Sequence, residues 1–144
     1  MPILIPSSPP FLLQVGGHTI DANNNNLVRS IVVEDHVDMA SFCSIMFDAD
    51  PEQKDLPVEI GEAVDIKLKT DTLSVFKGEI ISVDHSFQEK GTTTKIVRCI
   101  DHVHRLGRGR KTRFWNDKKD SDVAKEVASE SGLSVRCDAT EDVH

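Results

Sequence analysis

The sequence predicts a mainly β protein of the α+β class, in which an antiparallel β-barrel is followed by the beginning of a small α/β subdomain. Two observations predict this fold. Two long strand patterns at residues 73–87 and 94–104 flank a polar turn at residues 88–91, and strands joined in this way pair as a hairpin. From residue 121 to residue 131 the apolar spacing changes from period two to the spacing of a helix.

Size and composition limit what the chain can be. Its 144 residues provide one domain of ordinary size and a fragment of a second. Apolar residues make up 38% and aromatic residues only 5%, which predicts an aliphatic core. No apolar run reaches the roughly 20 residues that a membrane helix needs, and the N-terminus lacks the basic region of a signal peptide. We therefore expect assembly in the cytoplasm.

Three parts follow in chain order: an extended arm at residues 1–10, a barrel at 11–113 and the beginning of a second subdomain at 114–144. The arm holds four prolines, which cannot donate to a sheet; a strap onto a neighbour and a loose tail both remain open. The first strand candidates are rich in β-branched and aromatic residues, or alternate apolar with charged residues; they are residues 11–15, 27–34, 41–47 and 64–69.

The two arms of the hairpin complete the predicted barrel. In the first arm the apolar residues change face near Gly78, which predicts a bulge or bend there. We place Phe76 and Ile80, on either side of this glycine, on one face and Ile81, Val83 and Phe87 on the opposite face. The second arm is apolar on both faces, as in a barrel wall or a sandwich.

The predicted helix spans residues 121–131, with Ser121 as its N-terminal cap and Gly132 at its end. One face is apolar and consists of Val123, Ala124, Val127 and Ala128. A strand is predicted to begin at residue 133 and to run to residue 137. Because one helix and one strand cannot bury their own apolar faces, we interpret the chain as a fragment that stops within its second subdomain.

No catalytic, metal or cofactor site is predicted. His85, His102 and His104 suggest a metal site, but the expected register pairs His85 near Ile96, about 20 Å along the strand from His102. Cys99 could act as a nucleophile with a neighbouring histidine, but adjacent strand residues point to opposite faces. The three cysteines are widely spaced, with no metal-binding pair among them.

The basic segment, residues 105–113, carries five cations in nine positions: Arg105, Arg108, Arg110, Lys111 and Arg113. We predict these five as subunit-interface residues, whose arginines bind carboxylates of a partner chain or line a lumen. The alternative is a small nucleic-acid-binding β-barrel that uses the same segment. The net charge of -7 and the lack of interleaved aromatic residues disfavour nucleic acid.

Three stretches together resemble a known family. They are residues 76–80 (Phe-Lys-Gly-Glu-Ile), 99–113 (Cys-Ile-Asp-His-Val-His-Arg-Leu-Gly-Arg-Gly-Arg-Lys-Thr-Arg) and 120–133 (Asp-Ser-Asp-Val-Ala-Lys-Glu-Val-Ala-Ser-Glu-Ser-Gly-Leu). They look like the N-terminal hub region of VgrG-like spike proteins, which belong with the late control gene D proteins of contractile phage tails and the spikes of extracellular injection systems. The family usually has Gly-Tyr where this chain has Cys99 and Ile100.

This resemblance implies a barrel of the tail-hub or tube type and a structural role without catalysis. It implies a homotrimer whose paired barrels form a pseudo-sixfold ring and join the hexameric tube to the trimeric spike. The partners would be the tail tube protein and other baseplate subunits, with no small-molecule substrate. A membrane would be reached only through the assembled particle, which is virion-like or secreted. A hydrolase that uses Cys99 remains a weaker alternative.

Overall fold

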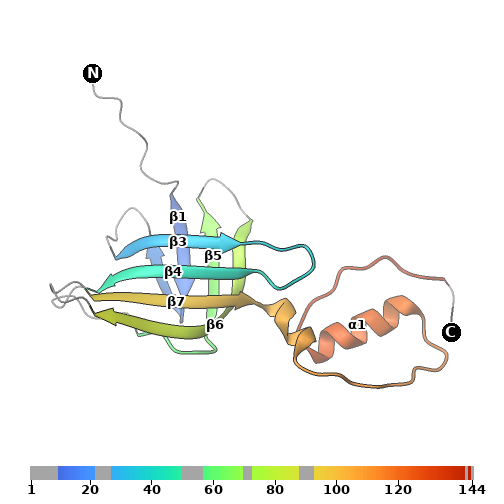
Figure 1. The fold of residues 1–144 in the computed structure, drawn as a ribbon. Coiled ribbons are helices and arrows are strands. Elements are labelled where there is room, and N and C mark those ends of the chain that lie inside the picture. Colours follow the sequence, from blue (N-terminus) through green and yellow to red (C-terminus); the bar gives the residue numbers. More distant parts are fainter. Residues whose placement is uncertain are drawn as a thin grey trace. The chain divides into compact units, whose positions relative to one another are not determined.

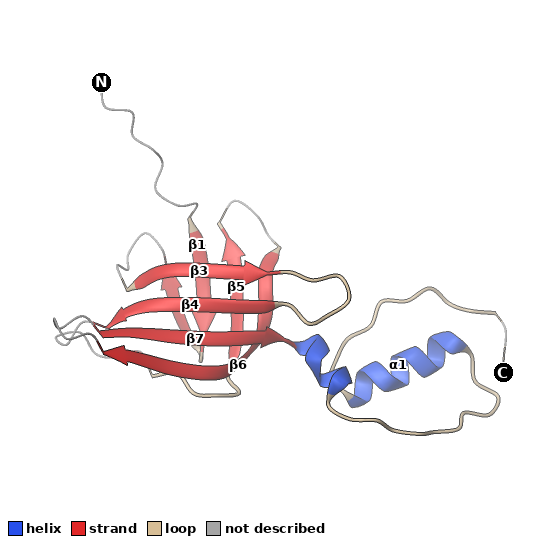
Figure 2. Ribbon diagram, viewed as in Figure 1, coloured by secondary structure: helices blue, strands red, loops and turns tan. Residues whose placement is uncertain are grey.

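The computed structural model describes residues 10–21, 27–49, 57–69, 73–87, 93–141 and 143. The chain divides into two compact units, Met1–Asp101 and His102–His144. Figure 2 shows strands in the first unit and helices in the second. The predicted arm at residues 1–10, apart from Pro10, and the predicted turn at 88–91 lie outside the described residues.

The first unit is a curled antiparallel sheet of seven strands, which confirms the predicted fold class. The strands are β1 (Phe11–Val15), β2 (His18–Asp21), β3 (Val28–Glu34), β4 (Phe42–Ala49), β5 (Ala63–Leu68), β6 (Ser74–Phe87) and β7 (Thr93–Asp101). Their order across the sheet is β2-β1-β5-β6-β7-β4-β3. In Figure 1, β1 and β5 cross behind β3, β4 and β7, so the sheet bends back over its own inner face as a barrel wall does.

The core lies on the inner face of this sheet and is mainly aliphatic, as the composition predicts. Its buried members come from every strand except β3 and are Leu13, Val15, Ile20, Cys43, Ile45, Phe47, Val64, Ile66, Phe76, Ile80, Val97 and Cys99. A pocket of about 450 Å³ is lined by residues of β3 on one side and by Phe11, Ile66 and Leu68 on the other. The two distant parts of the sheet therefore face each other across the core.

The strand β2 is an element that the sequence reading missed. It pairs with β1 through the register Val15↔His18, so only Gly16 and Gly17 form the turn. Both glycines have positive φ, 54° and 77°, as both central residues of a type I′ hairpin turn require. Only Ile20 of this short strand is buried, so its apolar pattern is weak.

The long hairpin of β6 and β7 is confirmed, but its irregularity lies elsewhere than predicted. The register shifts between Ile80, which pairs with Cys99, and Ser82, which pairs with Arg98. Ile81 is the extra residue of this bulge and is 40% exposed, whereas Ile80 is 1% exposed. The placement of Ile81 on a buried face was therefore wrong.

Phe87 is also exposed, at 79%, although the strand pattern places it on the same face as Val83. The last residues of β6 are exposed, and the buried core cluster contains none of them. Side-chain alternation continues to Phe87, but burial does not.

Gly78 has a different role from the one predicted. A Cβ atom at this position would lie 2.2 Å from the backbone oxygen of Ile100 and 2.8 Å from Cζ of Phe76. Glycine is needed here because the backbone of β7 and the side chain of Phe76 leave no space for a Cβ atom. Such a close approach of another strand is one of the uses of glycine in a sheet.

The second arm of the hairpin is shorter than predicted. β7 ends at Asp101, and His102–Gly107 form a 3₁₀ helix, so the placement of His102 and His104 on a strand was wrong. Asp101 is held at the strand end because its carboxylate accepts the backbone N–H of Ser41 at 2.8 Å and its own N–H donates to the carbonyl of Ser41 at 3.0 Å.

The second unit contains the predicted helix as α1 (Asp120–Glu130). Its N-cap is Lys119 and no side chain caps it, so the prediction that Ser121 is the cap was wrong; Ser121 is buried in the first turn. The helix ends as predicted at Gly132, whose φ is 69°. The N–H of Leu133 donates to Ala128 and that of Gly132 to Ser129, which is the Schellman pattern of hydrogen bonds.

The predicted strand at residues 133–137 does not form. These residues have no regular secondary structure, and the described part of the unit contains only an isolated bridge between Lys119 and Val143. On α1, Ala128 is buried as predicted, but Val127 is 37% exposed. No helix in the described part of the chain has the length and apolar character needed to cross a membrane.

Candidate functional site

The basic segment lies entirely in the second unit. Arg105 belongs to the 3₁₀ helix His102–Gly107, and the chain from residue 108 to residue 114 has no regular secondary structure. Glycines at positions 107 and 109 and the density of like charges disfavour a longer helix here. Apart from Arg105, the arginine and lysine side chains therefore project from a stretch of chain without regular secondary structure.

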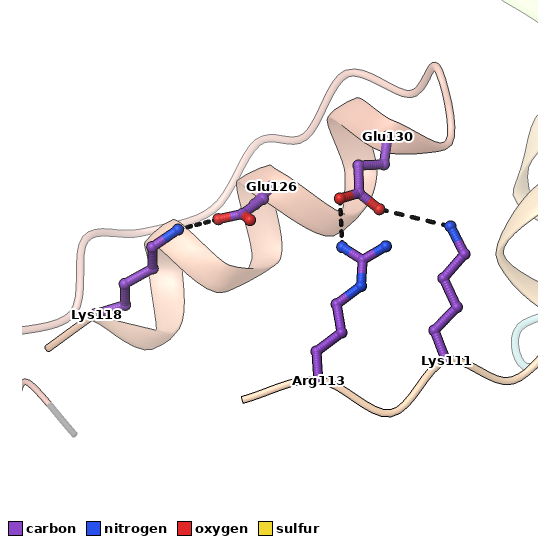
Figure 3. A network of polar contacts seen from close by, with 5 residues as sticks. All are labelled: Lys111, Arg113, Lys118, Glu126 and Glu130. Carbon is purple, nitrogen blue, oxygen red and sulfur yellow. Dashed lines mark hydrogen bonds and ion pairs between the residues drawn. The ribbon is translucent and has the colours of Figure 1, made fainter. Parts of the chain in front are cut away.

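Glu130, in the last turn of α1, anchors one half of the basic segment. Its carboxylate accepts a hydrogen bond from Arg113 and forms an ion pair with the Lys111 ammonium at 3.7 Å (Figure 3). One turn earlier on the same helix, Glu126 accepts a hydrogen bond from Lys118. Residues four apart project from the same face of a helix. Two carboxylates on this face of α1 therefore bind the segment of chain that precedes the helix.

These contacts change the pKa of both glutamates. The hydrogen bond from Arg113 has the largest effect and lowers the pKa of Glu130; desolvation opposes it to a lesser extent, and the positive charges of Arg113 and Lys111 lower the pKa further. The hydrogen bond from Lys118 lowers the pKa of Glu126 in the same way, with a contribution from Trp115. A carboxylate whose pKa is lower when folded stabilises the folded state above its unfolded pKa, and this stability is lost as pH falls through the folded value.

We expect Arg113→Gln to raise the pKa of Glu130 towards that of an unfolded peptide, because the substitution removes the main donor to its carboxylate. The pKa of Glu126 should stay low, because Lys118 is unchanged. Side-chain carboxyl chemical shifts, followed by NMR from neutral to acidic pH, measure both values in one sample. A Glu130 pKa that is the same with and without Arg113 would contradict the contact.

The other three cations of the segment have different surroundings. The Arg108 guanidinium lies 2.7 Å from Nε2 of His104. Arg105 lies at the end of α1, where its Nη1 would be 3.2 Å from a Cβ atom added at Gly132, and a cation is favoured beside the carbonyl end of a helix. Arg110 is exposed, and no ion pair joins it to another residue in the described ranges.

Together these residues form a groove of about 770 Å³, which we call the basic groove. It is lined by Arg105, Leu106, Arg108, Gly109, Arg110, Lys111, Thr112, Arg113, Trp115, Val127, Glu130 and Ser131. All five predicted interface residues belong to this lining. The sequence reading missed Glu130, Trp115 and Val127. The spacing of Glu126 and Glu130 on one helix face opposite a basic run was the available signal.

The alternatives that depend on cysteine and histidine chemistry find little support. Cys99 is fully buried and pairs across the sheet with Cys43, and the hydrogen bond with Cys43, together with burial, raises the pKa of the Cys99 thiol. A nucleophile must be a thiolate, so this site disfavours the hydrolase alternative.

His85 lies beside Lys95 in the register, one residue from the predicted partner, and its ring stacks on Phe87 at 6.3 Å between centroids. In the described ranges, no three histidine, cysteine or acidic residues are placed to hold a metal ion.

Comparisons with known proteins concern nearly the whole chain. The family described as Alg8 N-terminal domain matches residues 9–144. The fold is similar to that of the prophage MuSo2 43 kDa tail protein from Shewanella oneidensis, with a TM-score of 0.71 and 16% identity over 93% of this chain. It is also similar to the tail protein from Neisseria meningitidis MC58, with a TM-score of 0.61 and 19% identity over 84% of this chain. No curated protein matches.

The chain spans 42% and 33% of those two tail proteins, less than half of either. At these identities the likeness is one of fold, and it confirms the predicted tail-protein type of fold. The narrower resemblance to VgrG-like spike proteins, the trimer and the interface role of the basic segment stay predictions.

Proposed function

We propose that this chain, which belongs to the Alg8 N-terminal domain family, is a structural component of a contractile phage tail or a related injection apparatus. The observation that carries the proposal is the fold that it shares with a phage tail protein over 93% of its length. The motif resemblance of residues 76–80, 99–113 and 120–133 to spike-protein hubs narrows the role to the baseplate hub.

Open sheet edges support a role in assembly. The order of the sheet ends at β2 and at β3, and neither strand has a second neighbour among the described strands. An exposed strand edge has unpaired N–H and C=O groups and invites pairing with another chain. In a hub, neighbouring subunits would cover such edges.

At the finer level, we propose a homotrimer that joins the hexameric tube to the trimeric spike, with tube protein and other baseplate subunits as partners. It would have no catalytic activity, no cofactor and no small-molecule substrate. It would be assembled in the cytoplasm and leave the cell within the particle. Arg108 and Arg110 would contact a neighbouring subunit.

Deletion of the gene in a particle-producing strain tests the proposal. We expect the deletion to abolish complete particles in electron micrographs and complementation to restore them. Complementation with the Arg108→Glu/Arg110→Glu protein should give clearly fewer particles, because it reverses two charges of the basic groove. A matched double reversal outside the groove, Lys125→Glu/Arg136→Glu, should restore them fully.

The two parts of this experiment fail separately. Normal particles in the deletion strain would overturn the structural role. Normal particles with the Arg108→Glu/Arg110→Glu protein would overturn only the interface role of these arginines.

A further inference from the structure

We propose that an apolar pocket of the first unit binds the N-terminal arm of the same chain, with Ile3, Leu4 and Ile5 as the residues that enter it. The apolar pocket is the cavity of about 450 Å³ between β3 and parts of β1, β5 and β6. The inference goes beyond the proposed structural role and does not depend on it, because it concerns contacts within one chain.

The core is incompletely covered beside β3. None of the seven residues of this strand belongs to the buried core cluster, and Val28, Ile31 and Val33 only pack against it as partly buried side chains. Phe11, on the opposite wall, is also partly buried, although alternation places it on the same face of β1 as the buried Leu13. Apolar surface that faces the core therefore stays accessible here.

The lining of the apolar pocket favours an uncharged, aliphatic ligand. Seven of the nine residues that line it are apolar, and the other two are Arg29 and Ser30. The guanidinium of Arg29 lies 3.4 Å from the carboxylate of Asp48, so its charge has a partner within the sheet. Burial of aliphatic side chains is favourable in proportion to the apolar area removed from water. The pocket therefore suits aliphatic side chains better than ions.

The chain contains one segment with this character outside the described residues. Residues 1–9 carry no charged side chain, and three of them, Ile3, Leu4 and Ile5, are aliphatic and consecutive. No other range outside the described residues has two apolar residues in succession. Those ranges are residues 22–26, 50–56, 70–72, 88–92, 142 and 144. The arm is therefore the occupant that this sequence offers.

The arm begins beside the apolar pocket. The carbonyl of Pro10 accepts a hydrogen bond from the N–H of Lys69 at 2.8 Å, and the next pair in the register, Phe11 and Leu68, lines the pocket. Ile5 is five residues from Pro10, a reach of up to about 17 Å in extended chain. A short tether gives an effective concentration in the millimolar range, which favours the chain's own arm over that of another molecule.

The composition of the arm suits a return towards the pocket. Two serines at positions 7 and 8 follow a proline, and both residue types are common in turns. A turn centred on the serines would bring Leu4 level with Phe11. Because β1 is already paired with β2 and β5, the returning segment would cover the apolar pocket instead of joining the sheet beside β1.

The first test compares the full chain with the variant Ile3→Ser/Leu4→Ser/Ile5→Ser, which keeps the length of the arm. The dye 1-anilinonaphthalene-8-sulfonate binds exposed hydrophobic surface, and we expect the triple variant to raise its fluorescence. We also expect Tm to fall by about 4–8 °C, the shift for a modest loss of stability in a domain of this size. A peptide of residues 1–9, added to the variant, should reverse the rise in fluorescence.

Val37→Ser/Met39→Ser is the matched control. Both side chains are exposed, Val37 at 101% and Met39 at 62%, and neither lines the apolar pocket. This variant should not raise the dye fluorescence and should leave Tm unchanged. Far-ultraviolet circular dichroism of each variant verifies that the sheet remains folded.

Nuclear Overhauser effects identify the molecule that fills the pocket. In a uniformly carbon-13-labelled chain we expect contacts between the Leu4 methyl groups and the ring protons of Phe11. In a mixture of labelled and unlabelled chains, isotope-filtered spectra should lack these contacts, because both residues belong to one molecule. Val75→Asp should weaken the contacts, because it places a charge in the lining at a side chain that is 47% exposed.

Four results would overturn the proposal: unchanged dye fluorescence in the triple variant, an equal rise with Val37→Ser/Met39→Ser, no contact between Leu4 and Phe11, or contacts that appear in the isotope-filtered spectra of the mixture. The last result would show that the arm of a second copy fills the pocket. Because these measurements do not involve particles, their failure leaves the structural role to be decided by the deletion strain.

Discussion

Ile80→Ala is expected to lower the free energy of unfolding of the first unit by about 2–5 kcal/mol. Ile80 is almost completely buried in the core between the two halves of the curled sheet, so truncation leaves a cavity as well as lost apolar contact. Chemical denaturation followed by far-ultraviolet circular dichroism measures the change.

The adjacent residue provides the matched control. Ile81→Ala makes the same chemical change, but Ile81 projects from the bulge into solvent, so its loss should cost less than about 1 kcal/mol. Equal destabilisation by the two variants would show that the bulge is misplaced and that Ile81 points inward as the strand pattern predicted.

Gly78→Ala is expected to destabilise the same unit by about 1–3 kcal/mol, as overpacking in a core does. The added methyl group would lie 2.2 Å from the Ile100 carbonyl oxygen, so β6 and β7 must separate or the register must shift. The sign of the change in the free energy of unfolding is informative, because alanine in place of glycine ordinarily stabilises a strand by about 0.5–1 kcal/mol. Thermal and chemical unfolding both measure this effect.

Gly107→Ala is the control for this substitution. No atom lies within 4 Å of a Cβ atom at Gly107, so the change should be neutral or slightly stabilising. If Gly78→Ala proved equally neutral, the close approach of β7 to Gly78 would be contradicted.

The central hairpin could be predicted from the sequence because β-branched residues alternate on both arms around a short polar turn. The exact position of the bulge could not. A break in the alternation shows that one residue is extra, but which residue leaves the ladder depends on which face the rest of the sheet buries. The bulge was predicted at Gly78 because glycine often marks a bulge. Here a glycine is required because the Ile100 carbonyl leaves no room for a side chain.

The ends of elements were less predictable than the elements themselves. Val103 continues the apolar alternation of β7, but the strand stops where Asp101 binds the backbone of Ser41, sixty residues away. Residues 133–137 alternate as a strand does, yet a strand forms only beside a partner, and the described residues of the second unit provide none.

The candidate site was predictable in its charges but not in its connections. Five cations within nine residues are visible in any reading of the sequence. Glu130, which compensates two of them, lies seventeen residues beyond Arg113, and its place beside them depends on how the chain returns along α1. The identity of the cations that this carboxylate binds therefore appears only in the structure.

The bulge at Ile81 also limits how the hairpin can change in length. Ile80 pairs with Cys99 and Val83 with Val97, and both contribute to the core although one number is even and the other odd, because one residue is left out of the pairing with β7. A chain without Ile81 would pair continuously and keep Val83 opposite Val97, whereas one residue more in this interval would enlarge the bulge or turn Val83 towards water. Homologous chains should therefore tolerate the loss of one residue at this position better than the gain of one.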